Sequence, residues 1–315
     1  MAVTLAESAK LSQDALQRGV IETFILESIV LDRIPFEPIE GNAFAYNEEL
    51  ALPGVEFRAV NTAYTESTGT VNPKSEKLVI LGGDADVDTF IVKTRGNLND
   101  QRAVQTRMKV KAAAYKFQDA FVNGDSAVDV NGFDGLKKRL TGAQVIAAGT
   151  NGLPVIGADD AARHAFLDKL DELLSLLNGE AGALYMNGSI LAKIKSSARR
   201  LTIFDQTVDS FGKKIATYNG VPLLNIGKTA AGVEICPQTE TQGTAIGTTS
   251  SIYAVRYGQS FDDAAVTGLT NGGVTVRDLG EVSDKPVFRT RIEFFTGLGV
   301  FGGKGAARMT GVLNS

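Results

Sequence analysis

Residues suited to catalysis are scarce in this chain, which has one histidine, His164, and one cysteine, Cys236. A catalytic histidine needs an orienting acid and a nucleophile or metal beside it, but His164 lies in a segment rich in Asp and Leu. The pair could hold zinc only if carboxylates supplied most of the ligands. We therefore expect a solvated or packed His164, a small, at least half-buried Cys236, and no catalytic or metal centre.

A glycine motif near the C-terminus invites a nucleotide-binding interpretation. Residues 297–302 read Gly-Leu-Gly-Val-Phe-Gly, the spacing of a dinucleotide-binding turn. Too few residues follow Gly302 for the helix, second strand and acidic residue that such a site requires. Gly303-Lys304 precedes Gly305 rather than Ser or Thr, so the P-loop pattern is not met. We expect these glycines to allow close strand packing and predict no cofactor.

Two clusters of charge have alternative interpretations. Asp84, Asp86 and Asp88 alternate along a strand-like segment without the glycine and distal Glu of a calcium-binding loop, which favours a solvated strand edge protected from pairing by charge. A predicted long helix carries Arg102, Arg107, Lys109, Lys111 and Lys116. These residues could face nucleic-acid phosphates without sequence readout or form ion pairs between subunits, and both readings stay open.

Composition limits the class of protein. The chain has 315 residues, enough for one large or two ordinary domains, and its 43% hydrophobic and 22% charged content is that of a soluble globular protein. A net charge of −4 gives no bulk attraction to nucleic acid. No apolar run is long enough to span a bilayer, and no secretory signal is visible. A single cysteine permits no intrachain disulfide and is consistent with a reducing cytoplasm.

Helical and extended patterns divide the first half of the chain. A capping box at Thr4–Glu7 predicts a helix to about Arg18, and a second short helix follows over 20–28. Asn97 or Asn99 could cap a helix that runs to about Val122 and stops at Asn123-Gly124. Its apolar stripe is Val110, Ala114, Phe117 and Phe121, widened by Val104, Met108 and Tyr115.

A long hairpin is predicted between these helices. Strand-like residues 55–66 and 78–81, continued by 87–92, flank polar turn residues 67–74. An isolated hairpin is only marginally stable in water, so we expect it to lie on a neighbouring subunit. The assembly contacts expected at its tip are Glu66, Thr68, Gly69, Asn72 and Lys74.

The middle of the chain reads as mixed α/β after a glycine-rich boundary at 141–158. Asp159 or Asp160 caps a leucine-rich helix, residues 183–186 form a short buried strand, and Asn187 caps a further helix to Arg200. Strands follow at 221–226 and 251–255. Near the end, Val287, Arg289, Arg291 and Glu293 alternate with Phe288, Ile292 and Phe294, which predicts a strand followed by a glycine-rich segment and a closing apolar turn.

This order of parts resembles the tailed-phage major capsid proteins of the Hong Kong 97 type. The resemblance rests on the C-terminal segment 285–312, the helix ending in Asn123-Gly124, and Phe133-Asp-Gly-Leu136. It implies an α+β fold with an N-terminal arm (1–30) and a peripheral domain (31–140 and 283–315) containing a spine helix and sheet. It also implies a hairpin arm, the E-loop, at about 55–82, and an axial α/β domain over 141–282.

The resemblance also implies a function. The chain would be a non-enzymatic structural protein that self-assembles into the icosahedral shell around the double-stranded DNA genome of a tailed phage or prophage. Its partners would be itself, as pentamers and hexamers, then scaffold, portal and decoration proteins, and packaged DNA bound without sequence specificity, with no membrane. It would assemble in the host bacterial cytoplasm and reside in the virion capsid, where the helix residues 102, 107, 109 and 111 could face DNA.

Alternatives and departures accompany the resemblance. An encapsulin-type nanocompartment shell shares the fold but encloses protein, and a soluble enzyme that uses only acidic residues has no carboxylate pair to support it. Some relatives carry about a hundred further N-terminal scaffold residues, whereas this sequence begins at the arm, so we expect a separate scaffold or none. Lys74 and Lys77 lie where the family's type member forms a covalent cross-link, although solvated lysines are the simpler interpretation.

Overall fold

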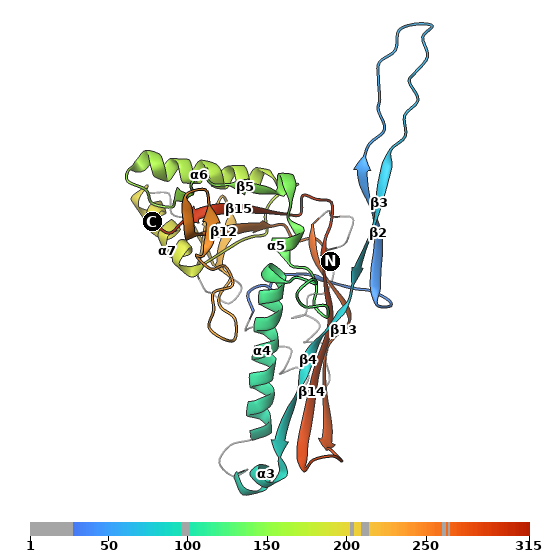
Figure 1. The fold of residues 1–315 in the computed structure, drawn as a ribbon, viewed down its shortest axis with the longest axis vertical. Helices are drawn as coiled ribbons and strands as arrows, with labels where there is room; N and C mark the ends of the chain where they lie inside the picture. The colour runs from blue at the N-terminus through green and yellow to red at the C-terminus, as the bar shows by residue number, and fades with distance from the viewer. Residues whose placement is uncertain (1–27, 96–100, 202–204, 209–213, 260–262, 264) are drawn as a thin grey trace.

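The computed structural model describes residues 28–315 except 96–100, 202–204, 209–213, 260–262 and 264. The predicted helices over 4–18 and 20–28, most of the N-terminal arm, and the Asn97 or Asn99 cap lie outside the described residues. The described chain has three parts: a long sheet with a helix beside it, an α/β unit at one end of that sheet, and an arm that projects beyond both (Figure 1).

Four strands of the described chain form the long sheet. Their order is β1 (Phe36–Pro38), β13 (Val266–Glu281), β14 (Val287–Val300) and β4 (Val79–Asp88), with β1 parallel to β13 and the other pairs antiparallel. The expected strand over 87–92 is wrong beyond Asp88, where helix α3 (Thr89–Arg95) begins. The Asp88 carboxylate accepts a hydrogen bond from the Phe90 amide at 2.7 Å, which is a capping contact.

Helix α4 (Gln101–Asn123) lies along this sheet beside β4 and β14 (Figure 1). Its predicted end at Asn123 is confirmed, and the predicted stripe from Val110 to Phe121 is buried. The predicted widening by Val104 and Met108 is wrong, because these side chains are 44% and 60% exposed. The buried stripe instead continues through Thr106, which lies four residues before Val110 and so on the same face of the helix. Val104 and Met108 are each two positions from Thr106, and residues with that spacing lie on nearly opposite sides of a helix.

The charged strand edge is also corrected. Strand β4 is an edge strand, but two of its three aspartates, Asp84 and Asp86, form ion pairs across the sheet in addition to meeting solvent. Asp84 stands opposite Arg291 and Asp86 opposite Arg289, and each arginine donates two hydrogen bonds to its partner carboxylate at 2.7–2.9 Å. The alternation predicted for residues 287–294 is confirmed, since Ile292 and Phe294 are buried on the opposite face of the same strand.

The α/β unit is built on a second sheet. Helices α6 (Asp160–Ser175) and α7 (Gly188–Arg200) pack on it, and their predicted caps are confirmed: Asp159 accepts from the Ala162 amide and Asn187 from the Ser189 amide. Among the described residues this sheet has nine strands: β5 (Val145–Ala147), β15 (Ala306–Leu313), β12 (Ala245–Val255), β7 (Ala183–Met186), β10 (Val221–Asn225), β9 (Lys214–Tyr218) and β8 (Asp205–Val208) in order, with β11 (Glu240–Gln242) beside β12 and β6 (Leu153–Pro154) beside β15.

Alternation along β7 connects two hydrophobic cores, one on each face of the strand. Leu184 and Met186 face the core beneath α6 and α7, whereas Tyr185 joins the cluster that contains Phe121 of α4. The ring centroids of Phe121 and Tyr185 are 6.0 Å apart. Because successive strand residues point to opposite faces, one short strand contributes to both cores and fixes the α/β unit against the spine helix.

Two C-terminal strands, β13 and β15, each belong to the sheet of the other predicted domain. Strand β13, expected in the unit 141–282, pairs along its length with β14 of the long sheet. Strand β15, expected as a closing turn of the first unit, pairs with β12 and β5 in the α/β sheet. The reason is main-chain pairing: β13 and β14 are consecutive antiparallel strands, and Ala307, Met309 and Val312 supply apolar side chains to the core beneath α6.

The arm differs in register from the predicted hairpin. Its ladder joins β2 (Ala43–Ala51) to β3 (Thr70–Lys77), and residues 52–69 extend beyond the ladder to a turn at 59–62, where Asn61 has a φ of 68°. The predicted tip at 67–74 is therefore wrong. Turn-forming residues there are tolerated because this ribbon has two strands with open edges, the setting in which a strand proline such as Pro73 is accepted.

Candidate assembly surfaces

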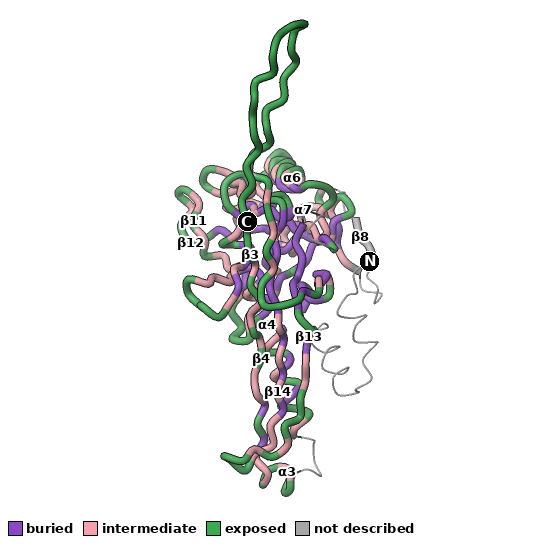
Figure 2. The backbone as a smooth tube through the Cα atoms, turned by 90° about the vertical axis from the view of Figure 1, so that its right-hand side faces the viewer, coloured by how far each residue is buried: buried purple, intermediate pink, exposed green. Residues whose placement is uncertain are grey.

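The arm presents apolar side chains to solvent along its outer half. Val55, Phe57 and Val60 are 95%, 108% and 87% exposed. Figure 2 shows the outer half of the arm, residues 52–69, exposed throughout, in contrast to the buried interior of the body. Exposed apolar clusters of this kind mark interaction surfaces. An arm without cover on its own subunit is suited to bury these side chains against another one.

The backbone of the outer arm is also largely unpaired. Within residues 52–69, all of which are described, the backbone–backbone hydrogen bond is Thr62 N to Ala59 O at 3.3 Å. Side chains bridge the two limbs: the Ser67 hydroxyl donates to the Gly54 carbonyl at 2.9 Å, and the Thr65 amide donates to Glu56 at 2.6 Å. That backbone hydrogen bond lowers the pKa of Glu56. Most main-chain donors and acceptors remain available to a partner.

The residues predicted at the arm tip are spread along the returning limb. Asn72 and Lys74 lie in β3, where Lys74 forms an ion pair with Glu48 of β2. Glu66 and Thr68 are exposed nearer the tip, and Gly69 lies close to the backbone of the other limb. Sequence reasoning missed Phe57 and Val60, which the structure places at the outer end. The signal was present in the alternation Val55-Glu-Phe-Arg58, which was read as an ordinary strand.

A polar and aromatic cluster fixes the root of the arm. Arg139 of α5 (Leu136–Arg139) holds the Glu76 carboxylate with two hydrogen bonds, and the Tyr46 hydroxyl donates to the same carboxylate at 3.4 Å. The Tyr46 ring packs edge-on against Phe301 with centroids 4.9 Å apart. Burial and the Glu76 charge raise the pKa of the Tyr46 hydroxyl. The arm is therefore anchored at its root and uncovered beyond it.

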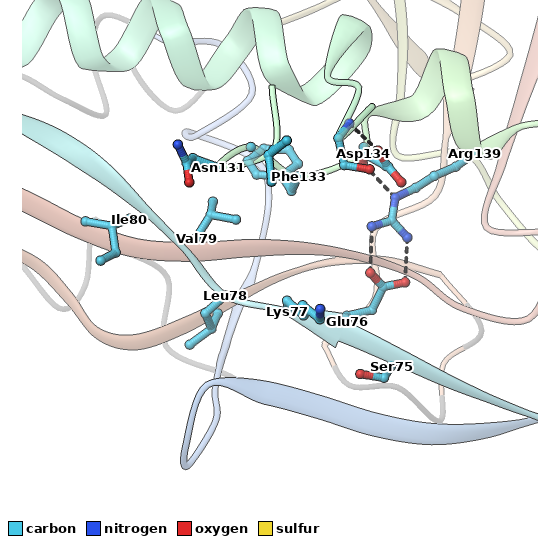
Figure 3. A pocket seen from close by; sticks show the side chains of 13 residues that line it. Ser75, Glu76, Lys77, Leu78, Val79, Ile80, Asn131, Phe133, Asp134 and Arg139 are labelled. Carbon is cyan, nitrogen blue, oxygen red and sulfur yellow. Dashed lines mark hydrogen bonds and ion pairs between the residues drawn. The ribbon is translucent and has the colours of Figure 1, made fainter. Parts of the chain in front are cut away.

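A groove opens beside this anchor, and we call it the root groove (Figure 3). It has a volume of about 820 Å³ and lies between the extended run 75–80 and the loop before α5. Ile80 and Val130 line it with 70% and 83% of their surfaces exposed. A smaller cavity of about 300 Å³ shares Val79, Ile80 and Phe133 with it and reaches the end of α4.

The predicted DNA-facing residues do not lie on one surface. Arg102 pairs with Asp278 of β13 at 2.6 Å and lies over the Phe288 ring at 5.1 Å. Lys109 extends past Gly83 of β4. Arg107 and Lys111 are exposed, and the Lys111 ammonium is 5.6 Å from the centroid of the Tyr115 ring. The spacing of α4 thus divides the four residues between the sheet side and the solvent side.

The residues considered for catalysis are separated in the structure. His164 is exposed on α6, whereas Cys236 is buried, which raises the pKa of its thiol to about 12. No cluster of potential metal ligands occurs among the described residues. The GxGxxG glycines lie in β14 and the turn after it, and a Cβ at Gly299 would approach the Phe301 ring to 2.5 Å. No described helix has the length and apolarity needed to cross a bilayer.

Comparisons with known proteins agree with this architecture. The sequence profile described as major capsid protein GP7 matches residues 13–162. No protein of curated function matches the sequence. Among solved structures, the shell of the holo-SrpI encapsulin complex from Synechococcus elongatus PCC 7942 has a TM-score of 0.67 and 17% identity, covering 100% of this chain and 98% of that chain.

Two capsid structures show the same likeness. The capsid of the native GTA particle has a TM-score of 0.63 and 14% identity, covering 91% of this chain and 90% of that chain. The capsid of Myoviridae phage XM1 has a TM-score of 0.55 and 13% identity, covering 89% of each chain. At these identities the likeness establishes the fold, and it confirms the α+β class expected from the sequence.

Proposed function

We propose that this chain, a major capsid protein of the Hong Kong 97 fold type, self-assembles into the icosahedral shell that encloses the double-stranded DNA genome of a tailed phage or prophage. The observation that carries the proposal is the arm. Val55, Phe57 and Val60 are almost completely exposed, and the outer backbone makes few hydrogen bonds of its own. Such a segment is unfavourable in a monomer and becomes useful when a neighbouring subunit covers it.

Assembly follows from contacts between different surfaces of identical subunits. When an arm of one subunit lies on the body of the next, the contact is head-to-tail, and such contacts generate closed rings when the rotation permits. Pentamers and hexamers are the rings that an icosahedral shell requires. Individually weak contacts add over many interfaces, so the shell is stable although each arm contributes little.

The role is structural, and we infer no enzymatic turnover. Scaffold, portal and decoration proteins and packaged DNA are the partners that fit a capsid subunit, and assembly would take place in the host bacterial cytoplasm. Support for a structural role comes from the separation of His164, exposed on α6, from the buried Cys236. Burial raises the pKa of the Cys236 thiol, which keeps it protonated. Exposed Arg107 and Lys111 on α4 are the candidates for sequence-independent contact with packaged DNA.

An encapsulin-type shell is the second candidate, because the encapsulin structure matches over the whole length of this chain. The contents of the particle distinguish the two functions. Particles purified from cells that carry the intact phage genome, treated with nuclease outside and then opened, should release protected double-stranded DNA. Particles that release one protein species and no DNA would establish the nanocompartment function instead.

A further inference from the structure

We propose that Asn271 is a site of spontaneous covalent modification, at which its side-chain amide is lost to attack by the backbone nitrogen of Gly272. The reaction requires an asparagine whose following backbone nitrogen is accessible and can rotate towards the side chain, and a following glycine offers the least steric resistance. This inference goes beyond the proposed shell function and does not depend on it, because it concerns chemistry within one subunit. The chain has seven Asn-Gly steps, at residues 123–124, 131–132, 151–152, 178–179, 187–188, 219–220 and 271–272.

Backbone hydrogen bonds hold the attacking nitrogen at three of these steps. The amides of Gly124, Gly132 and Gly152 donate to the carbonyls of Ala120, Asp129 and Gly149, at 2.9, 2.9 and 3.2 Å. A paired backbone nitrogen must leave its acceptor before it can turn towards the side chain, and that local opening costs free energy. The folded chain therefore slows the reaction at these three steps.

Side-chain contacts restrain two further steps. Asn187 is 4% exposed, and its side chain caps α7 and donates to the Cys236 carbonyl. Asn219 lies in the tight turn between β9 and β10 with a φ of 48°, and its amide nitrogen donates to Asp171 at 3.1 Å. Both amides must break existing hydrogen bonds to reach the geometry of attack, so the fold slows the reaction here as well.

The step after Asn271 lacks these restraints. Asn271 and Gly272 are both exposed and lie in an irregular part of β13. Pairing with β14 passes from Thr270 directly to Val274, and pairing with β1 ends at Thr270, so Gly272 has no place in either ladder. Residues left out of a ladder in this way are typical of a bulge. The attacking nitrogen is therefore accessible in the folded subunit.

The step after Asn178 is the nearest competitor, because Asn178 is also exposed. A Cβ placed on Gly179 would lie 3.4 Å from Nε of Arg256, whereas a Cβ placed on Gly272 would meet no atom within 4 Å. The Arg256 side chain thus limits rotation of the backbone after Asn178. More room for rotation favours the reaction at Asn271.

The reaction balances with water as its only co-reactant. The Gly272 nitrogen bonds to Cγ of Asn271 and gives up its proton, the bond between Cγ and Nδ2 breaks, and ammonia leaves. Water then opens the resulting five-membered succinimide at one of its two carbonyl carbons. Opening at one carbon gives aspartate, and opening at the other gives isoaspartate, in which the main chain runs through the side-chain carbon. Either product adds one negative charge to a chain whose formal net charge is −4.

The modification changes a contact at the start of the arm. The Asn271 amide nitrogen donates to the Gly41 carbonyl at 3.2 Å, in the loop between β1 and β2. Beside it, the Ile39 amide donates to the Thr270 carbonyl at 2.8 Å. A carboxylate at position 271 has no proton to donate to the Gly41 carbonyl. We expect the loop that leads into the arm to loosen as the modification accumulates.

Peptide mapping of aged protein tests the assignment. The purified native chain is incubated in warm, mildly alkaline buffer, and mass spectrometry of digested samples follows the loss of each Asn-Gly amide. Folded protein should lose the Asn271 amide before any other. Chain unfolded in guanidinium chloride should react at similar rates at all seven steps, because each glycine is then unrestrained. An earlier loss at another step in the folded protein, or retention of the Asn271 amide while the unfolded chain reacts, would overturn the proposal.

Asn271→Gln is the matched variant, because the same attack on glutamine must close a six-membered ring, which forms more slowly. Loss of the amide at position 271 should stop, and the order of reaction among the other six steps should not change. Isoaspartate in the folded protein, labelled by enzymatic methylation, should fall by the share assigned to position 271. Undiminished isoaspartate in this variant would show that another step carries the modification.

Hydrogen exchange tests the consequence for the start of the arm. Asn271→Asp reproduces the charged product, and Asn178→Asp adds the same charge at an exposed position after α6. Backbone amides of residues 39–42 should exchange faster in Asn271→Asp than in the native chain and at the native rate in Asn178→Asp. Equal exchange in all three proteins would overturn the loosening of this loop and leave the modification itself standing.

Discussion

Arg139 donates two parallel hydrogen bonds to the carboxylate of Glu76, from Nη1 to Oε1 at 2.5 Å and from Nη2 to Oε2 at 2.6 Å. The two side chains are 18% and 13% exposed. They connect α5 of the body to the end of strand β3 at the root of the arm. A planar guanidinium fixes orientation as well as distance. The pair therefore determines the angle at which the arm leaves the subunit.

Loss of this pair should affect assembly more than folding. Arg139→Lys keeps the charge but not the two-pronged geometry, and we expect the free energy of unfolding to fall by about 1–3 kcal/mol with a large loss of shells. Lys116→Gln, which removes an exposed pair with Asp129 at 3.9 Å, is the control and should cost roughly 0–1 kcal/mol. Denaturant unfolding and sedimentation measure the two effects, and indistinguishable behaviour of the two variants would refute the anchoring role.

The outer arm should be dispensable for folding and required for assembly. Replacing residues 52–69 with a short Gly-Ser turn keeps the β2–β3 ladder and the Glu76–Arg139 anchor intact. Cooperative unfolding of the subunit should be unchanged because these residues contribute no buried side chain. Shell formation, followed by electron microscopy, should be lost, and normal shells from this variant would contradict the proposal.

The buried stripe of α4 should carry most of that helix's contribution to stability. Phe117→Ala and Phe121→Ala each remove a fully buried ring and should cost about 3–5 kcal/mol. Met108→Ala on the exposed side should cost far less, since 60% of that side chain is already in water. Urea denaturation at neutral pH compares the three, and a Met108→Ala cost equal to that of Phe117→Ala would refute this packing.

Acid should weaken the long sheet through its cross-strand pairs. Hydrogen bonds from Arg291 and Arg289 lower the pKa values of Asp84 and Asp86 in the folded state. The stabilisation is therefore complete above the unfolded pKa of about 3.9 and is lost as pH falls through the lower folded values. Asp84→Asn should reduce the free energy of unfolding by about 1 kcal/mol at pH 7.

The pH dependence of that difference is the decisive readout. Native protein and Asp84→Asn should converge in stability as pH falls below the folded pKa of Asp84, because both then lack the charge. Urea titrations from pH 7 into the acid range follow this convergence. A difference that stays constant over the whole range would show that the pair contributes through packing and not through ionisation.

Contact with packaged DNA should involve the solvent side of α4. Arg107→Gln/Lys111→Gln should leave empty shells intact and lower the thermal stability of filled shells, with an effect that shrinks as salt rises. Arg102→Gln, which breaks the pair with Asp278 on the sheet side, is the control and should affect empty and filled shells alike. Equal damage to both kinds of shell by the double variant would favour ion pairs between subunits instead.

Local signals in the sequence predicted much of the fold. The caps Asp159 and Asn187, the end of α4 at Asn123 and the alternation in β14 depend on neighbouring residues, so they could be recognised along the chain. The exposure of Met108 could not, because it depends on which turn of α4 meets the sheet. The exchange of β13 and β15 between the sheets also depends on long-range pairing that leaves no local pattern.

The assembly surfaces were predicted only in outline. A projecting arm followed from an extended segment without a local core, but its register depended on pairing between 43–51 and 70–77, and turn-forming residues at 67–74 suggested a different tip. The Glu76–Arg139 anchor joins residues 63 positions apart. The root groove lies between segments that meet only in the folded chain, so no sequence motif could indicate it.

Electron microscopy of the purified, full-length chain tests the central claim most directly. Concentrated protein should form closed icosahedral shells of uniform size, built from rings in which each arm lies on the neighbouring subunit. A protein that remains monomeric at all concentrations and salt conditions in which it is folded, or that forms only open filaments, would contradict the account.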